Sequence, residues 1–156
     1  MPTIPKSEGE TSMAARREAM AVLAAAPSAE LARLAAALAL PPAALLRVPE
    51  TSLVTVRGMI GGGGAAFNVG EATVTRATVR LETGEVGHAY ALGRDGEKAR
   101  LSAIADALWQ DPARRDEVER GLLAPLRAAA REAAATRRAE TEATRVDFFT
   151  LVRGED

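Results

Sequence analysis

Three arginines on a predicted hairpin and its exit are the residues best suited to chemistry in this chain: Arg76, Arg80 and Arg94. A guanidinium can bind a carboxylate or phosphate through two parallel hydrogen bonds, so these side chains could hold an anion. Arg76 and Arg80 share a strand face about 13 Å apart, which suits a polyanion or two carboxylates better than one phosphate. Arg94 lies just before a predicted helix N-terminus, where anions are stabilised.

A simpler interpretation is that these arginines form salt bridges, either within the chain or with acidic residues of a partner. The nearest acids in the sequence are Glu71, Asp95 and Asp106. Such carboxylates could carry out acid–base chemistry or hold magnesium, but their spacing matches no metal-ligand pattern. We therefore expect them to form ion pairs or helix caps, and we assign no catalytic residue and no metal ligand.

Histidine, cysteine and glycine motifs offer little further chemistry. His88 is the only histidine and cysteine is absent, so disulfides, cysteine-ligated iron–sulfur clusters, thiol catalysis and a zinc site are excluded. The run Gly61–Gly64 lacks the lysine and the serine or threonine that end a phosphate-binding loop. We expect His88 to be packed and the glycine run to be a flexible connection.

A small antiparallel sheet is predicted to position the arginines. β-Favouring and alternating residues indicate strands over 45–48, 53–59, 67–81 and 86–92. A two-residue turn at Thr83–Gly84 would place Leu81 opposite Val86. The face packed on the helices would then carry Ala77, Val79, Leu81, Val86, His88, Tyr90 and Leu92. The other face would carry Arg76, Thr78, Arg80, Gly87, Ala89 and Ala91.

Helices are predicted before and after these strands. Residues 12–25 form one, ended by Pro27, and residues 29–40 form a second with Ser28 as its cap. Asp95 and the pair Asp111–Pro112 are start signals for two more. A long alanine-rich helix over 126–144 has a thin apolar face. The pattern predicts an α+β fold: a small antiparallel sheet packed against N-terminal helices and a long C-terminal helical region, with a β-favouring C-terminal segment.

That last segment, Val146–Val152, contains two adjacent phenylalanines, Phe148 and Phe149. In a strand their side chains point to opposite faces, so one can enter this domain while the other needs a further surface. We expect a partner interface there, although a strand enclosed between two layers of this domain is the alternative. The predicted interface residues are Phe148, Phe149, Leu151 and Arg153.

Composition limits the class of protein. The chain has 156 residues, 47% of them hydrophobic, and a net charge of −1. Residues 1–11 predict a flexible tail, and 12–156 a single domain. No basic stripe indicates nucleic acid, and no apolar run reaches the length of a membrane span or a signal peptide. We expect a cytoplasmic protein.

Several short pieces, taken in order and with their spacing, resemble the PhnG family of the bacterial carbon–phosphorus lyase machinery. The resemblance runs from about the first helix to the C-terminus, so that 12–156 would be one PhnG-like α+β domain. The matching pieces are Gly70–Arg76, Val79–Leu81, Gly93–Asp95, Asp106–Leu108, Arg145–Phe149 and Val152–Gly154.

The resemblance implies a subunit that acts with PhnH-, PhnI- and PhnJ-like chains, helped by a PhnL-like ATPase. Their assembly would transfer a phosphonate to ribose C1 of ATP and release adenine, in phosphonate catabolism for phosphorus assimilation. The resemblance also implies ATP and magnesium for the complex and no cofactor bound by this chain. It leaves open whether the chain is an enzyme, and favours an accessory subunit of the transferase that is not catalytic alone. The alternative is a small-molecule or anion-binding domain acting on its own.

Overall fold

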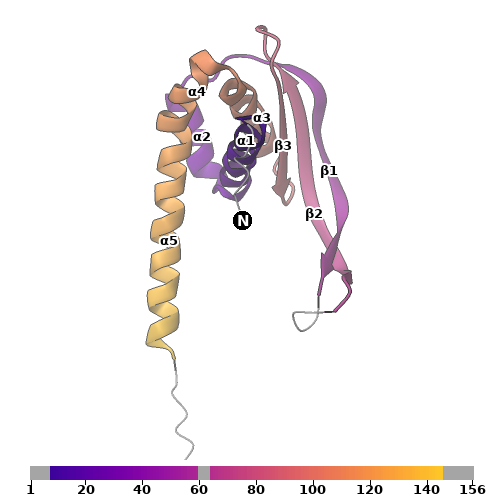
Figure 1. Cartoon of the computed structure of the whole chain (residues 1–156), viewed down its shortest axis with the longest axis vertical. Coiled ribbons are helices and arrows are strands. Elements are labelled where there is room, and N and C mark those ends of the chain that lie inside the picture. Colours follow the sequence, from indigo (N-terminus) through magenta and orange to yellow (C-terminus); the bar gives the residue numbers. More distant parts are fainter. Residues whose placement is uncertain (1–7, 60–63, 146–156) are drawn as a thin grey trace, which may run out of the picture.

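The computed structural model describes residues 8–59 and 64–145, and within them it has helices and one antiparallel sheet (Figure 1). The predicted α+β class is confirmed. In chain order the elements are α1 (Glu8–Ala25), α2 (Ser28–Ala37), β1 (Ala44–Gly58), β2 (Phe67–Arg80), β3 (Val86–Leu92), α3 (Gly96–Gln110), α4 (Pro112–Val118), the π-helical turn η1 (Glu119–Leu123) and α5 (Ala124–Ala143).

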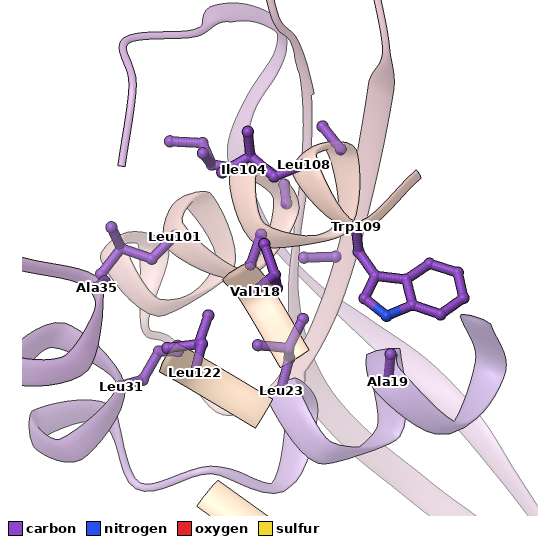
Figure 2. Close-up of a cluster of buried hydrophobic side chains, with 14 of the residues drawn as sticks. Ala19, Leu23, Leu31, Ala35, Leu101, Ile104, Leu108, Trp109, Val118 and Leu122 are labelled. Carbon is purple, nitrogen blue, oxygen red and sulfur yellow. The ribbon is translucent and has the colours of Figure 1, made fainter. Parts of the chain in front are cut away.

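Helix α3 is the centre of the hydrophobic core. Its residues 101–109 are all buried, because the sheet covers it on one side and α1, α2 and α4 pack on the others. Figure 2 shows Ile104 and Leu108 of α3 in one cluster with Leu31 of α2 and Leu122 of η1. Alanines fill much of the rest of α3, which lets neighbouring backbones approach closely.

The closest approach in the core lies between α3 and β3. A Cβ atom added to Gly87 would lie 1.9 Å from the carbonyl oxygen of Ala103 and 2.6 Å from the backbone nitrogen of Ala107. No side chain fits in that space, so only glycine lets β3 lie directly on the α3 backbone. Gly87 therefore fixes how the sheet sits on the helices.

The sheet has the order β1-β2-β3, with both pairs antiparallel. The two separate strands predicted over 45–48 and 53–59 are one strand, β1, which continues through Pro49. Register shifts on both sides of Arg47 allow the strand to accommodate Pro49. In addition, β1 lies at the edge of the sheet, where the N–H that proline lacks is not needed for a hydrogen bond to a neighbouring strand. The division predicted at Pro49 is therefore wrong.

The register predicted for the β2–β3 hairpin is also wrong, by one residue. Arg80, and not Leu81, faces Val86. The turn has three residues: the Leu81 N–H donates to the Glu85 carbonyl, the Gly84 N–H donates to the Leu81 carbonyl, and Gly84 has φ 109°. A type I turn completed by a glycine at positive φ explains the extra residue.

The shift exchanges the two faces of β3 but not those of β2. Ala77 and Val79 are buried against the helices as predicted, and Ala89 and Ala91 join them. The predicted placement of His88, Tyr90 and Leu92 on the packed face is wrong, because all three are exposed on the same face as Arg76 and Arg80. The small side chains of β3 face α3, and its large ones face away.

Capping residues set several helix starts as expected. Asp95 accepts a hydrogen bond from the Lys98 N–H at 2.8 Å, and Asp111 accepts one from Ala113 at 2.9 Å. Helix α2 begins at Ser28 itself, so this residue does not occupy the predicted cap position. Helix α1 begins at Glu8, within the segment 1–11 that the sequence predicted as a tail.

Two elements project from this packed body (Figure 1). One is the ribbon formed by residues 53–59 and 67–73, where β1 and β2 continue beyond the end of β3. The other is the arm of α5, residues 128–145, whose side chains are all exposed. In the described part of the chain, no single helix is long and apolar enough to cross a membrane. Met13–Ala25 and Ser28–Ala37 reach that length and composition only as a pair bent by 116°.

Candidate functional site

The face of the sheet turned away from α3, here called the outer face, gathers the predicted arginines with larger side chains. Arg76 of β2 lies opposite Tyr90 of β3, and Thr78 lies opposite His88. Glu50 of β1 lies on the other side of Arg76. The outer face is thus cationic and partly aromatic, because the three-residue turn brings the large residues of β3 beside the arginines.

Arg76 has partners within its own chain. Its Nη2 and Nε lie 3.2 and 3.3 Å from Oε2 of Glu50, and Arg47 approaches the same oxygen at 3.0 Å. Hydrogen bonding to Tyr90 and to Glu50 raises the pKa of Arg76, and the bonds from Arg76 and Arg47 lower the pKa of Glu50. One carboxylate shared by two arginines leaves a net positive charge at this point.

The three arginines do not converge on one site. Arg80 lies opposite Val86 at the turn end of β3, whereas Arg94 follows the other end of that strand. Within residues 8–59 and 64–145, neither Arg80 nor Arg94 makes an ion pair or side-chain hydrogen bond, and Arg80 lines a hollow with Pro42 and Glu82. Their role in binding an anion or a partner stays a prediction.

The helix N-terminus beside Arg94 already has a negative charge at its start. The carboxylate of Asp95 accepts the Lys98 N–H, and hydrogen bonds from Ser28 and from that N–H lower the pKa of Asp95. An anion bound at this helix N-terminus would be repelled by the carboxylate of Asp95. The expectation of a helix cap is therefore confirmed for Asp95.

Asp106 is the most buried acid of the chain's described part and forms an ion pair, as expected, with a partner that the sequence does not reveal. Its two oxygens accept bonds from Nε and Nη2 of Arg16 at 2.9 and 2.7 Å, and Oδ2 also accepts the backbone N–H of His88 at 2.9 Å. The side chain of Asp106 is 1% exposed and that of Arg16 is 32% exposed. This carboxylate ties α1, α3 and β3 together, and its hydrogen bond to Arg16 raises the pKa of that guanidinium.

His88 itself is on the surface. Its Nδ1 lies 3.3 Å from the hydroxyl oxygen of Thr78, an exposed contact on the outer face. The third acid considered from the sequence, Glu71, is exposed on the ribbon. Among the residues that the structure describes, no group of three histidine or acidic side chains could hold a metal ion. We therefore assign the magnesium implied by the resemblance to none of the described residues.

The root of α5 is held by a polar network that sequence patterns also missed. The indole N–H of Trp109 donates to Glu119 at 2.7 Å, and Arg127 donates to the other oxygen of Glu119 at 2.7 Å. Burial raises the pKa of Glu119, but the bonds from Arg127 and Trp109 outweigh it and the net direction is down. The guanidinium of Arg115 stacks over the Trp109 ring at 4.5 Å. The network fixes the direction in which α5 leaves the body.

Two sets of predicted residues lie outside the described part of the chain. The interface predicted at Phe148, Phe149, Leu151 and Arg153 falls there, as does most of the glycine run Gly61–Gly64.

Comparison with known proteins agrees with the resemblance found in the sequence. The family model described as phosphonate metabolism protein PhnG matches residues 14–154. A curated relative from Rhizobium meliloti (strain 1021) is 55% identical over 153 residues, which cover 97% of each chain. That relative is named alpha-D-ribose 1-methylphosphonate 5-triphosphate synthase subunit PhnG. On both findings, the chain belongs to the PhnG family of phosphonate metabolism proteins.

Proposed function

We propose that this chain is an accessory subunit of a complex that transfers a phosphonate to ribose C1 of ATP and releases adenine. Its partners are PhnH-, PhnI- and PhnJ-like chains, with a PhnL-like ATPase that assists them. ATP and magnesium enter through the assembled complex, in the cytoplasm. The chain shapes or stabilises the complex and does not catalyse the transfer alone.

One observation carries this proposal: the relative that matches 97% of the chain at 55% identity is named as a subunit of the corresponding synthase. At that identity over 97% of both chains the fold is shared, so a shared role is the simplest explanation. Two surface features support it. The arm of α5 and the ribbon both project with exposed side chains, and such elements gain stability when another chain covers them.

The test is reconstitution with and without this chain. The PhnH-, PhnI- and PhnJ-like proteins of the same organism are co-expressed with the tagged chain, and the purified assembly is given ATP and methylphosphonate together with the PhnL-like ATPase. We expect co-purification, adenine release by the full assembly, a large loss when this chain is omitted, and none from this chain alone. A chain that behaves as a monomer and ignores those proteins, or that releases adenine unaided, contradicts the proposal.

A second role is favoured by the unpaired state of Arg80 and Arg94 within the described residues. Either guanidinium could contact the triphosphate or the phosphonate at a site shared with a neighbouring subunit. Arg80→Met and Arg94→Met should then raise the KM for ATP or methylphosphonate in an assembly that still forms. Arg33→Met is a matched control, because Arg33 is exposed on α2 and pairs with Glu30. Unchanged kinetics in both variants would reject this role.

The segment predicted as a partner interface is tested separately. Phe149→Ala and Phe148→Ala should weaken co-purification with the PhnI-like chain if one ring anchors a partner. Leu151→Ala and Arg153→Ala extend the scan along the segment. Capture that is unaffected by all four changes would remove the segment from the interface.

A further inference from the structure

Strand β3 lies at one edge of the sheet, and α1 and α3 pack beside it (Figure 1). In an antiparallel pair, residues that exchange backbone hydrogen bonds alternate with residues that do not. The Gly93 N–H donates to the Thr73 carbonyl at 2.9 Å, which fixes this alternation between β2 and β3. The residues whose N–H and C=O groups point away from β2, along the free edge, are therefore Val86, His88, Tyr90 and Leu92.

Side chains of α3 close the first part of this free edge. The side-chain amide of Gln110 donates to the Val86 carbonyl at 2.8 Å, and the carboxylate of Asp106 accepts the His88 N–H at 2.9 Å. The two side chains are four residues apart on α3, a rise of about 6 Å, and the groups they meet are two residues apart on β3, about 6.6 Å. Because these steps nearly match, a row of α3 side chains follows the edge of β3.

The row makes no bond at its next step. Ser102 is one turn before Asp106 on α3, and Tyr90 is the next residue of β3 whose backbone points to the free edge. Ser102 is 3% exposed, and its hydroxyl has no hydrogen-bond partner among the described residues. Within residues 8–59 and 64–145, the N–H and C=O of Tyr90 make no hydrogen bond either. The edge is thus closed up to the His88 N–H and open from there to Leu92.

A hollow of 330 Å³ lies at this open part of the edge. Its lining includes Met20, Leu23 and Ala24 of α1, Tyr90 of β3 and Ser102 of α3. Arg17 of α1 also borders it, is exposed, and forms no ion pair with any described residue. One water molecule takes up about 30 Å³, so a single bridging water would leave most of the hollow empty.

The unpaired groups indicate what binds there. A free N–H and a free C=O on one strand residue are complemented by the backbone of another extended segment, which offers the same two groups. A strand laid beside β3 would turn every second side chain toward the helices, so that one of them enters the hollow. A side chain with an apolar stem and one polar atom, as in threonine, matches the apolar walls and the Ser102 hydroxyl. An acidic residue further along the segment would pair with Arg17.

We propose that the free edge of β3 from His88 to Leu92 binds an extended segment of a neighbouring subunit, which becomes a fourth strand of the sheet. This inference rests on the proposed function, since the segment belongs to another chain of the same complex. The segment pairs with the N–H and C=O of Tyr90 and places one side chain in the hollow beside Ser102. The bonds from Gln110 and Asp106 end the pairing at His88.

The first test removes the N–H that the added strand needs. Tyr90→Pro deletes this group but no hydrogen bond between β2 and β3, because Tyr90 and Arg76 form a pair that exchanges none. Tyr90→Ala is the matched control, since it loses the same side chain and keeps the N–H. Each variant is co-expressed with the PhnH-, PhnI- and PhnJ-like chains, and the amount of complex is measured by affinity capture.

A second variant tests the hollow without touching the strand. Ala24→Leu fills the hollow from α1, and Ala14→Leu, at an exposed position of the same helix, is its control. Thermal unfolding of each isolated variant checks that the chain still folds. Residue-resolved amide exchange of the wild-type chain, alone and in the complex, follows the Tyr90 N–H. The Ala89 and Ala91 amides, which point to β2, are the internal reference.

We expect Tyr90→Pro and Ala24→Leu each to reduce capture about tenfold, as when one interface hydrogen bond is lost and its partner is left unpaired. The two controls should stay near the wild-type level. The Tyr90 amide should exchange at least about tenfold more slowly in the complex, while Ala89 and Ala91 change little.

Capture that neither Tyr90→Pro nor Ala24→Leu reduces, or a Tyr90 amide that exchanges equally fast in the complex, overturns the added strand. An equal loss in Tyr90→Ala assigns the effect to the tyrosine side chain and also overturns it. If the isolated chain is dimeric and its Tyr90 amide is already protected, the strand comes from a second copy, and the proposal is wrong. Failure of the wild-type chain to be captured contradicts the proposed function instead, so the two failures are distinguishable.

Discussion

The packed body and the two projecting elements use small and apolar residues in opposite ways. In the body, Gly87 and the alanines of α3 remove side-chain volume so that backbones touch, and the apolar residues around them are buried. In the ribbon, leucine, valine and phenylalanine remain exposed, and in α5 alanines cover a helix that this chain leaves open to solvent. The core around α3 is closed by side chains of this chain, whereas the projecting elements have surfaces suited to further contacts.

The largest expected effect separates two glycines of the sheet. Gly87→Val should destabilise the chain by at least about 3 kcal/mol, because its Cβ cannot avoid the α3 backbone. Gly70→Val in the ribbon should cost little or stabilise slightly, since nothing lies within 4 Å of the added Cβ and valine favours strands. Urea unfolding of both variants measures the difference. Equal losses would show that the ribbon is packed like the body.

Removing the buried carboxylate of the body should have the next largest effect. Asp106→Ala leaves Arg16 and the His88 N–H without their acceptor and is expected to cost about 2 kcal/mol, reduced from the fully buried case because Arg16 reaches solvent. Asp116→Ala, at an exposed position on α4, serves as the control and should be nearly neutral. If chemical unfolding shows a similar loss of unfolding free energy in both variants, Asp106 does not hold α1, α3 and β3 together.

A smaller effect should appear at the N-terminus of α3 and depend on pH. The pKa of Asp95 is lowered in the folded chain, so its contribution is full above the ordinary aspartate pKa and is lost as pH falls through the lowered value. Asp95→Ala should cost about 1 kcal/mol at pH 7. The gap to the wild type should narrow on acidification. A gap that is constant down to pH 2 would mean that the charge of Asp95 contributes nothing, and Asp95→Asn, which keeps a cap acceptor, provides the reference.

The smallest effect is expected in the arm of α5. Ala134→Gly should lower the helix signal in circular dichroism but change the unfolding free energy of the body by less than about 0.5 kcal/mol, because every side chain of the arm is exposed. Ala105→Gly, in the buried helix α3, should cost more than about 1 kcal/mol. If the two substitutions lower the unfolding free energy equally, the arm unfolds together with the body and does not differ from it in packing.

Local signals in the sequence predicted most elements of the body. Asp95, the Asp111–Pro112 pair and Pro27 mark helix ends by chemistry that acts over three or four residues, and the structure has those ends. The strands β2 and β3 follow from their composition. These features could be predicted because helix capping and strand preference depend on residues that are close together in the sequence.

The register of the β2–β3 hairpin and the long-range side-chain pairs could not be predicted from neighbouring residues. Thr83–Gly84 is compatible with a two- or a three-residue turn, and only the hydrogen bonds of Leu81 decide between them. The pairing of Arg16 with Asp106 spans 90 residues. One signal was missed: Gly87, Ala89 and Ala91 alternate as very small residues on one strand face, which indicates close contact with a helix rather than an open surface.

Hydrogen–deuterium exchange of the chain alone and in the assembled complex tests whether other subunits cover the projecting elements. We expect slower exchange on assembly in residues 53–59, 67–73 and 128–145, with little change in α3, which is already buried. Unchanged exchange in both the ribbon and the arm of α5, within a complex that has formed, would contradict it.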